Sequence, residues 1–521
     1  MSVEDTPENN NEIKDPKDSL TGLEDEILQK KPKSTLKLIY TILAISFFFG
    51  AFNLTIFFNN FLLPDYLCSP LVFACKAKVE HDPNAALELQ VFSTVRTLST
   101  IVFMISLVVG GAISDDVRSR FGNRAPMILI GAIIAGIGYA SFPILARGNN
   151  FAIVLLISSI IFMVIHIGLG FALAPDYALI SELFIKEERG WAGLGFAGIG
   201  LIGTMIGYAL QEVSKPGTNL PDVPTPTITA ANAAWITTGL IAGGVIIFLG
   251  LLTFILTPKY NPPFPADGTI SDILATPRYL FEMGSGNSAN RDFLLMFVIG
   301  ILWGGGGYII DTYFASFLKA MKDKSYVTLD PANLLLLIGI AAAFFAAPAG
   351  IVIAKLGKIK SGMIGSIMLG FFSFMVAQSF IWADNPIYAL ALVAAAGTIF
   401  ITAVNVSLPA DLVPRGKEGQ FMGLFIIAAN LLSPIAGTLA TAISVQYKND
   451  ALAGYSTIFL LPTIVYFIAV FILAFMHYEE QLEGEYQMYY RRYLLFKGYV
   501  SDKTRVAALK VSSSLRLKKS R

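Results

Sequence analysis

Twelve long apolar runs constrain this chain more than any other feature of its sequence. A helix needs roughly 20 apolar residues to cross the ~30 Å hydrocarbon core of a bilayer, and each run reaches that length. Hydrophobic residues make up 55% of the 521 residues and charged residues only 14%, which is too apolar for a soluble protein. We therefore expect an all-α membrane protein with twelve transmembrane helices, near residues 36–63, 88–112, 125–146, 151–181, 190–211, 232–257, 292–318, 332–354, 361–382, 387–410, 420–445 and 452–477.

The remaining composition excludes several classes of protein. A net charge of +1 gives no basic excess for binding nucleic acid. The chain has three histidines and two cysteines, Cys68 and Cys75, which predicts no metal site and leaves a single loop disulfide open. No Walker A sequence and no nucleophile–base constellation occur, so we expect neither an ATP-driven pump nor an enzyme, and no cofactor. GLGFAGIGLIG, at 193–203, lies inside an apolar run and predicts close helix packing rather than dinucleotide binding.

The distribution of Lys and Arg predicts the orientation. If both termini are cytoplasmic, the inner loops hold thirteen Lys and Arg against eight in the outer loops, and the terminal segments add sixteen inside. The positive-inside rule therefore places both termini in the cytoplasm of an integral membrane protein, which we expect in the cell membrane. The one remaining cation, Arg96, lies within the second span.

The chain also repeats itself after six spans. GGAISDDVRSRFGNR follows the second span and GIVIAKLGKIK ends the eighth, and each has a glycine followed by basic residues around a second glycine. After the fourth and tenth spans, Glu182 and Asp411 each precede a glycine by eight residues. This symmetry predicts two six-helix halves. The expected segments are a disordered cytoplasmic N-terminal segment at 1–35, halves at 36–257 and 291–478, a cytoplasmic bridge at 258–290 and a basic cytoplasmic C-terminal segment at 479–521.

Polar residues recur at membrane depth in every third span. A charge in mid-membrane costs roughly 2.5–3.5 kcal/mol, so such residues are expected to face a cavity rather than lipid. The first helix of each three-helix unit is therefore expected to line a central cavity, and the third helix to face lipid. The polar residues concerned are Asn53, His166, Asp176, Tyr308, Asp311, Thr398, Thr402 and Asn405.

These features together resemble the major facilitator superfamily of secondary transporters. The resemblance rests on twelve spans in two halves, the G-x-x-x-D…R-x-G-x-R loop after the second span, its degenerate copy after the eighth, and E-x6-R-G after the fourth. SRFGNRAP and ADLVPRGKEGQFMG look most like the sucrose-transporter and glycoside–pentoside–hexuronide:cation symporter groups. The resemblance implies transport of a small solute by alternating access, here expected from a monomer in the lipid bilayer.

The resemblance implies that the loop after the second span is a conformational latch. Asp115 would meet the positive N-terminal end of the eleventh helix near Gly419, Arg120 and Arg124 would pair with Glu182 or Asp411, and Arg189 would close the network. A role of the arginines in topology alone stays open. In the second half Ala354 replaces the loop Asp, and Glu418 stands where the family often has Arg, so the second latch is expected to be weaker or differently wired. The predicted latch residues are Gly111, Asp115, Arg120, Gly122, Arg124, Glu182, Arg189, Gly350, Lys355, Gly357, Lys358 and Asp411.

Three ionisable residues are candidates for ion coupling or gating: Asp311, Arg96 and Asp176. Asp311 and Arg96 are expected in the outer half, where they form a gate pair, a proton site with its modulator, or a static ion pair. Asp176 either carries a proton or belongs to the latch. The four glycines at 304–307 indicate a flexible or broken seventh helix. The first two spans lack a mid-membrane acid, which favours a proton over sodium as the coupling ion.

Neutral polar and aromatic residues predict the substrate class. Asn53, Tyr308, Trp303, Thr402, Asn405 and Gln378 supply the donors, acceptors and aromatic faces that bind a hydroxylated solute such as a sugar. His166 is either a further contact, a hydrogen-bonded interior residue or a proton relay. Together these residues predict proton-coupled sugar symport. Export of another solute (a lipid, pigment or drug) and a non-transporting membrane receptor remain as alternatives.

Overall fold

The computed structural model describes residues 35–57, 85–146, 151–214, 228–261, 288–326, 331–378, 384–413, 417–447 and 450–476, and some side chains within these ranges, including those at 85–97, are not described. The expected terminal segments, Cys68, Cys75 and most of the expected bridge lie outside the described residues. Twelve described segments are long and apolar enough to cross a membrane, so the twelve predicted spans are confirmed.

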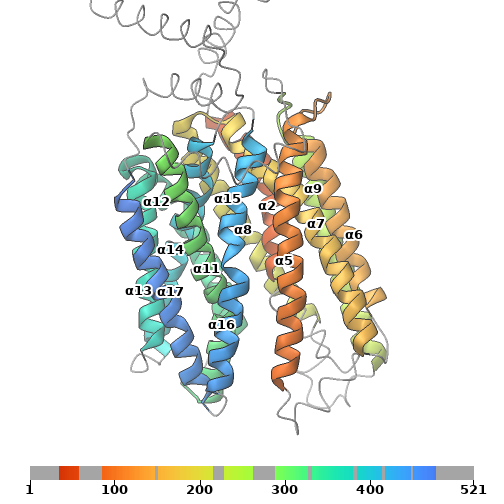
Figure 1. Ribbon diagram of the computed structural model, residues 1–521, viewed down its shortest axis with the longest axis vertical. Helices are drawn as coiled ribbons and strands as arrows, with labels where there is room; N and C mark the ends of the chain where they lie inside the picture. The colour runs from red at the N-terminus through yellow and green to blue at the C-terminus, as the bar shows by residue number, and fades with distance from the viewer. Residues whose placement is uncertain are drawn as a thin grey trace, which may run out of the picture.

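The helices form two groups of six spans (Figure 1). The first group comprises α2 (Thr35–Phe57), α5 (Ala85–Asp116), α6 (Ala125–Leu145), α7 (Phe151–Leu183), α8 (Lys186–Ser214) and α9 (Ile228–Leu256). The second comprises α11 (Ser288–Asp323), α12 (Pro331–Leu356), α13 (Lys358–Ala377), α14 (Asp384–Leu412), α15 (Glu418–Leu431), α16 (Ser433–Gln446) and α17 (Ala451–Ala474). Most backbone polar groups inside a helix are satisfied within that helix, which is what a lipid environment demands.

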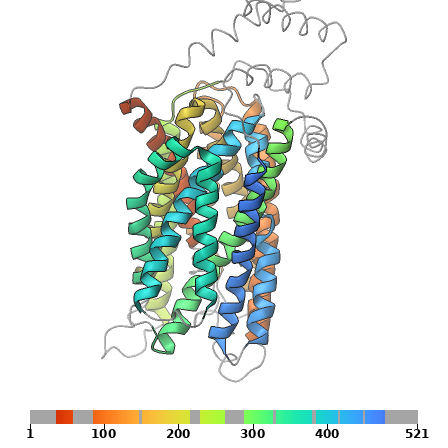
Figure 2. The same cartoon turned by 90° about the vertical axis from the view of Figure 1, so that its left-hand side faces the viewer.

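We call the end of the molecule at which α2 begins and α17 ends the proximal end, and the opposite end the distal end. In Figure 2, which faces the second group, the helices of that group run side by side between the two ends, and the start of α2 lies at the top. Successive spans alternate in direction, so the loops after α5, α7, α12 and α14 all lie at the proximal end.

Small residues set the closest helix contacts. A Cβ atom at Gly203 of α8 would collide with the backbone carbonyl of Gly50 in α2, and one at Gly193 with the carbonyl of Ala403 in α14. The glycine-rich run 193–203 thus packs α8 against both groups, as the sequence predicted. Close approach of this kind stabilises helices in lipid by van der Waals contact.

The structure does not contain the break that the glycines at 304–307 indicated as one alternative for the seventh helix. α11 is continuous from Ser288 to Asp323, and its glycines are packing positions: a Cβ atom at Gly305 would lie 3.0 Å from the side chain of Leu432, and one at Gly306 would lie 2.9 Å from the ring of Tyr466. Neighbouring helices come so close here that side chains do not fit. The poor helix propensity of glycine is overridden by this packing.

The interruption lies instead in the eleventh span, which was expected as one helix over 420–445. α15 ends at Leu431 and α16 begins at Ser433, with Leu432 between them. Pro434 stands at the second position of α16, where its missing N–H breaks the hydrogen-bond ladder. Ser433 donates its hydroxyl to the carbonyl of Asn430 at 2.6 Å, which satisfies one of the carbonyls left at the end of α15.

Candidate functional site

A cavity of about 310 Å³ lies between the two groups of helices. Its lining comes from α2, α5 and α7 on one side and from α11, α14, α15 and α16 on the other, with one residue each from α13 and α17. The predicted lining by the first, fourth, seventh and tenth spans is therefore present. The third helices of the units contribute more than expected, because Leu369 of α13 and Tyr466 of α17 also reach the cavity.

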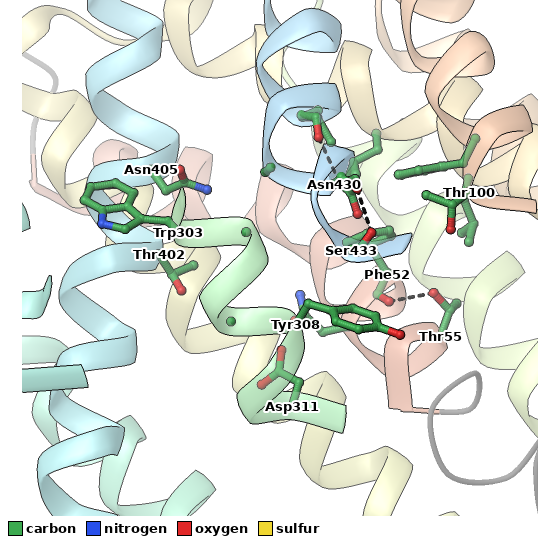
Figure 3. A pocket seen from close by; sticks show the side chains of 18 of the residues that line it. Phe52, Thr55, Thr100, Trp303, Tyr308, Asp311, Thr402, Asn405, Asn430 and Ser433 are labelled. Atoms are coloured by element: carbon green, nitrogen blue, oxygen red, sulfur yellow. Dashed lines mark hydrogen bonds between the residues drawn. The ribbon is translucent and has the colours of Figure 1, made fainter. Parts of the chain in front are cut away.

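Seven of the predicted coupling and substrate residues line this cavity: Asn53, His166, Trp303, Tyr308, Asp311, Thr402 and Asn405. In Figure 3, Trp303, Thr402 and Asn405 lie on one side, Phe52, Thr55 and Thr100 on the other, and Tyr308 and Asp311 between them. Asp311 is exposed, so the cavity offers a carboxylate to a bound molecule. Residues from both groups thus face one shared space.

The hydrogen bonds of the lining residues decide which of their polar atoms remain for a ligand. The indole N–H of Trp303 donates to the hydroxyl of Ser366 at 2.8 Å, so this tryptophan presents its ring rather than its donor. The amide nitrogen of Asn53 donates to the carbonyl of Phe49 at 2.9 Å, which leaves its oxygen for a ligand. The side-chain oxygen of Asn405 is buried and has no hydrogen-bond partner among the described residues. Buried polar atoms of this kind are normally satisfied, so Asn405 marks a position for a ligand or water.

His166 is tied to the scaffold. Its Nδ1 is 2.8 Å from the carbonyl of Phe162, and its ring packs edge-on against Phe103 at 5.9 Å between centroids. This geometry is that of a hydrogen-bonded interior residue whose other edge faces the cavity. It fixes the ring orientation and the position of Nε2.

Several lining residues were missed by the sequence analysis. Asn430 and Ser433 flank the break between α15 and α16, and Thr55, Thr100 and Tyr466 lie in the cavity wall. The signal for the break was the Ser-Pro pair at 433–434 inside an apolar run. Thr55 and Thr100 gave no comparable signal, because a threonine in an apolar helix often bonds to its own helix, as Thr55 does to the carbonyl of Phe52.

Gln378 does not line the cavity. The predicted pair of Arg96 and Asp311 cannot be compared with the structure, which does not describe the Arg96 side chain. Gln378 follows the distal end of α13 and is not among the residues that line the cavity, so its predicted substrate contact is wrong for this conformation. Its span ends at Ala377, earlier than the hydropathy indicated. Arg96 lies in α5, but its side chain is outside the described residues, and the pairing with Asp311 stays a prediction.

A buried charge network lies at the proximal end beside α15. We call it the Arg124 network; it contains Asp115, Arg124, Glu182 and Glu418. Asp115 of α5 accepts hydrogen bonds from the backbone N–H groups of Gly419 and Gln420 at 3.0 Å each, so a carboxylate of the first group caps a helix of the second. This is the contact that the family resemblance implied. It places negative charge at a helix N-terminus, where it is stabilised.

Arg124 holds this network together from a fully buried position. Its guanidinium lies 2.5 Å from both Asp115 and Glu182 and 3.9 Å from Glu418, and it donates to the hydroxyl of Ser114 at 2.6 Å. Burial lowers the pKa of Arg124, but the carboxylates of Asp115 and Glu182 raise it, and the net direction is upward. Arg124 therefore stays a cation and neutralises part of the acidic charge around it.

A second network lies between α8, α13 and α14, and we call it the Asp411 network. Arg189 donates to the carboxylate of Asp411 at 2.9 Å and to the carbonyl of Ala410 at 3.0 Å, which joins the first group to the second. Lys358 of α13 forms an ion pair with the other oxygen of Asp411. Asp411 is thus held between two cations.

The loop glycines of the predicted latch have structural roles. Gly122 and Gly357 adopt φ values of 94° and 82°, which glycine reaches without strain. Gly111 packs directly on the backbone of Gly419, and Gly350 packs on the side chains of Leu194 and Trp191. All four positions let the two groups approach each other or let the loop turn sharply.

Three residues expected in the latch take part in neither network: Arg120, Lys355 and Asp176. Arg120 is exposed and lies over the ring of Phe121, with 4.7 Å between its guanidinium carbon and the ring centroid, so its predicted pairing with an acid is wrong. Lys355, at the end of α12, is exposed rather than part of the Asp411 network. Asp176 is buried in α7 and has no hydrogen-bond partner among the described residues, so it does not belong to either network.

Comparisons with known proteins agree with this architecture. No protein-family model and no curated protein matches the chain. Solved structures do: the human organic anion transporter MFSD10 (TETRAN) is 16% identical with a TM-score of 0.58, covering 85% of this chain and 100% of its own. The chain has the fold of a major facilitator superfamily transporter.

Two further structures support the same fold. FucP, a major facilitator superfamily transporter in the outward conformation, is 14% identical with a TM-score of 0.56, covering 84% of this chain and 99% of its own. A bacterial homologue of the iron transporter ferroportin in an outward-facing state is 14% identical with a TM-score of 0.56, covering 84% of this chain and 98% of its own. At these identities the likeness shows the fold alone and singles out no subgroup, so the narrower resemblance to sucrose transporters stays a prediction.

Proposed function

We propose that this protein is a proton-coupled symporter of a small hydroxylated solute, most simply a sugar, that works by alternating access. The observation that carries the proposal is the cavity between the two groups, whose wall combines amides, hydroxyls and aromatic rings with the exposed carboxylate of Asp311. Amides and hydroxyls bind the hydroxyl groups of a solute, and the ring of Trp303 packs against its apolar face.

The fixed charges favour a neutral solute. Asp311 is the cavity's carboxylate, and the described lining residues include no Lys or Arg. An anionic solute would therefore meet repulsion at Asp311, which argues against transferring the organic anion substrate of MFSD10 to this chain. The fucose:proton symport of FucP supports the proposal as an analogy within the same fold.

The two proximal networks supply the gate. We propose that they are latches that hold the cytoplasmic side shut in this conformation, with Arg124 and Asp411 as their centres. We infer that the proximal end is the cytoplasmic side, because most of the Lys and Arg that the structure describes lie there. Transport then alternates between this state and one in which both networks open. The chain acts as a monomer in the cell membrane.

Proton flux in proteoliposomes tests this function. Vesicles loaded with a pH-sensitive dye are challenged with a panel of mono- and disaccharides, using wild type, Asp311→Asn and the control Asp450→Asn, which changes an exposed carboxylate at the start of α17. We expect sugar-dependent acidification in wild type and the control, and its loss in Asp311→Asn. A folded wild-type protein that gives no response to any sugar of the panel would contradict the sugar assignment.

A further inference from the structure

Asp176 stands apart from every other acid of the described membrane spans. It is 0% exposed, and neither of its carboxylate oxygens has a hydrogen-bond partner among the described residues. Glu182 and Asp411, which are buried to a similar degree, have Arg or Lys within ion-pair distance. The fold therefore buries a carboxyl group in α7 without the compensation that it gives to its other buried acids.

The position of Asp176 links the two functional regions of α7. Leu173 and Tyr177, on either side of it in sequence, line the cavity. Glu182, six residues further, lies about 9 Å along the helix axis and belongs to the Arg124 network. Asp176 thus lies between the solute cavity and the proximal latch, on a helix that contributes to both.

Among the residues that the structure describes, the helices around α7 bring no counter-charge to Asp176. α7 packs against α2, α5, α6, α8, α14 and α15, and Tyr177 is its titratable neighbour in sequence. The described titratable groups of these helices lie mostly near their proximal ends. They are Lys37 and Tyr40 of α2, Asp115 and Asp116 of α5, Tyr139 of α6, Lys186, Glu188 and Arg189 of α8, Tyr388 and Asp411 of α14 and Glu418 of α15, with His166 and Glu182 on α7 itself.

Desolvation decides the charge state of such a group. An ionised carboxylate that leaves water without a partner costs several kcal/mol, whereas the neutral acid is penalised far less. A fully buried and unpartnered carboxyl is therefore stable in the closed-latch state only with its proton bound. Ionised Asp176 needs water or a cation, and water can reach it only when helices around α7 separate.

We propose that Asp176 is a proton-binding site that holds its proton while the proximal latches are closed and releases it when they open. The inference rests on the proposed coupled transport and adds a second protonation site to it, besides Asp311. Loading forms an O–H bond on the Asp176 carboxyl, and release breaks that bond and transfers the proton to water at the proximal side. No group is oxidised or reduced in this step.

Infrared spectroscopy tests the bound proton without any solute. A neutral carboxylic acid has a C=O stretching band that is separate from the carboxylate bands. We expect purified wild type at neutral pH to show such a band, Asp176→Asn to lose its Asp176 component, and Asp450→Asn to keep it. Asparagine is nearly isosteric with the neutral acid, so the variant is expected to fold, and Asp176→Glu provides a second variant with a shifted band. An unchanged band in folded Asp176→Asn would overturn the proposal.

Transport measurements then separate this proposal from the proposed function. Solute counterflow needs alternation but no net proton movement, whereas accumulation against a gradient needs coupling. We expect Asp176→Asn to retain counterflow and to lose proton-driven accumulation. Accumulation at the wild-type level in Asp176→Asn would overturn the proposal. Absence of counterflow for every solute in wild type would instead contradict the proposed function, while the infrared result would still decide the protonation of Asp176.

Discussion

The Arg124 and Asp411 networks occupy equivalent places in the two repeats, yet their charges are reversed. The first surrounds one cation with three carboxylates, and the second surrounds one carboxylate with two cations. Asp115 joins the groups through a helix N-terminus, whereas Ala354 occupies the matching position near the end of α12 and Arg189 joins the groups through its side chain. Equivalent backbone positions therefore join the two groups at the same end with opposite electrostatics.

The difference determines how strongly each network is destabilised when one of its charged residues is removed. Asp411 has two cationic partners, so losing one leaves the other in place. Arg124 is the shared partner of three acids, so losing it leaves three buried carboxylates close to one another. Removing one member of a buried ion pair costs most when the remaining charge has no other partner. The two networks are thus expected to fail unequally.

The largest effect is expected from removing one cation from each network. Arg124→Met leaves three acids without their shared cation and is predicted to destabilise the closed state by about 3–5 kcal/mol. Lys358→Met is predicted to destabilise it by well under half of that amount, because Arg189 still pairs with Asp411. The rate of alkylation of a cysteine placed at Ala174, which is buried beside Gly423 at the α7–α15 contact, measures opening in a background lacking Cys68 and Cys75. Equal rates in the two variants would contradict the comparison.

A smaller effect is expected from two equivalent glycines. A Cβ atom at Gly419 would lie 2.5 Å from Nη1 of Arg124 and 2.6 Å from the carbonyl oxygen of Gly111, whereas one at Gly190 would lie 3.3 Å from Cγ2 of Ile353. Gly419→Ala is therefore predicted to lower the melting temperature by several degrees and Gly190→Ala to leave it nearly unchanged. Thermal unfolding of both variants in one detergent measures this, and a larger loss in Gly190→Ala would be inconsistent with the packing described here.

The smallest effect is expected from restoring the missing acid. Ala354 is exposed at the end of α12, next to Ile353, which packs against Gly190 near the start of α8. Ala354→Asp places a carboxylate near that helix N-terminus and near Arg189, and is predicted to stabilise the closed state by about 0.3–1 kcal/mol. Slower alkylation of the cysteine at 174 is the expected result. Faster alkylation would show that a carboxylate at position 354 destabilises the closed state, which would contradict the prediction.

The sequence predicted the spans from a simple signal, and it predicted the centres of the networks through the resemblance to a transporter family. Apolar length alone defines a span, whereas the loop motifs that contain Asp115, Arg124, Glu182 and Asp411 were interpreted through that resemblance. The sequence did not predict which basic residues lie outside the two networks. Arg120 and Lys355 carry the same charge as Arg124 and Lys358, and only the tertiary path of each loop decides which of them is exposed.

Tertiary contacts also explain the remaining errors. The glycines at 304–307 predicted a weak helix, but the packing of Leu432 and Tyr466 against α11 makes glycine the residue that fits there. Gln378 follows its helix by one residue, which shifts it to the distal end and out of the cavity wall. The isolation of Asp176 depends on six neighbouring helices and has no signal in its own sequence neighbourhood.

Distances between spin labels test most directly the claim that the proximal networks hold one end of the cavity shut. Labels at the exposed positions Arg120 and Lys355 span the two groups at the proximal end, and labels at Leu145 and Lys324 span them at the distal end. We expect Arg124→Met to lengthen the proximal distance and to shorten the distal one, as the protein shifts to the opposite state. Unchanged distances, or both distances growing together, would contradict it.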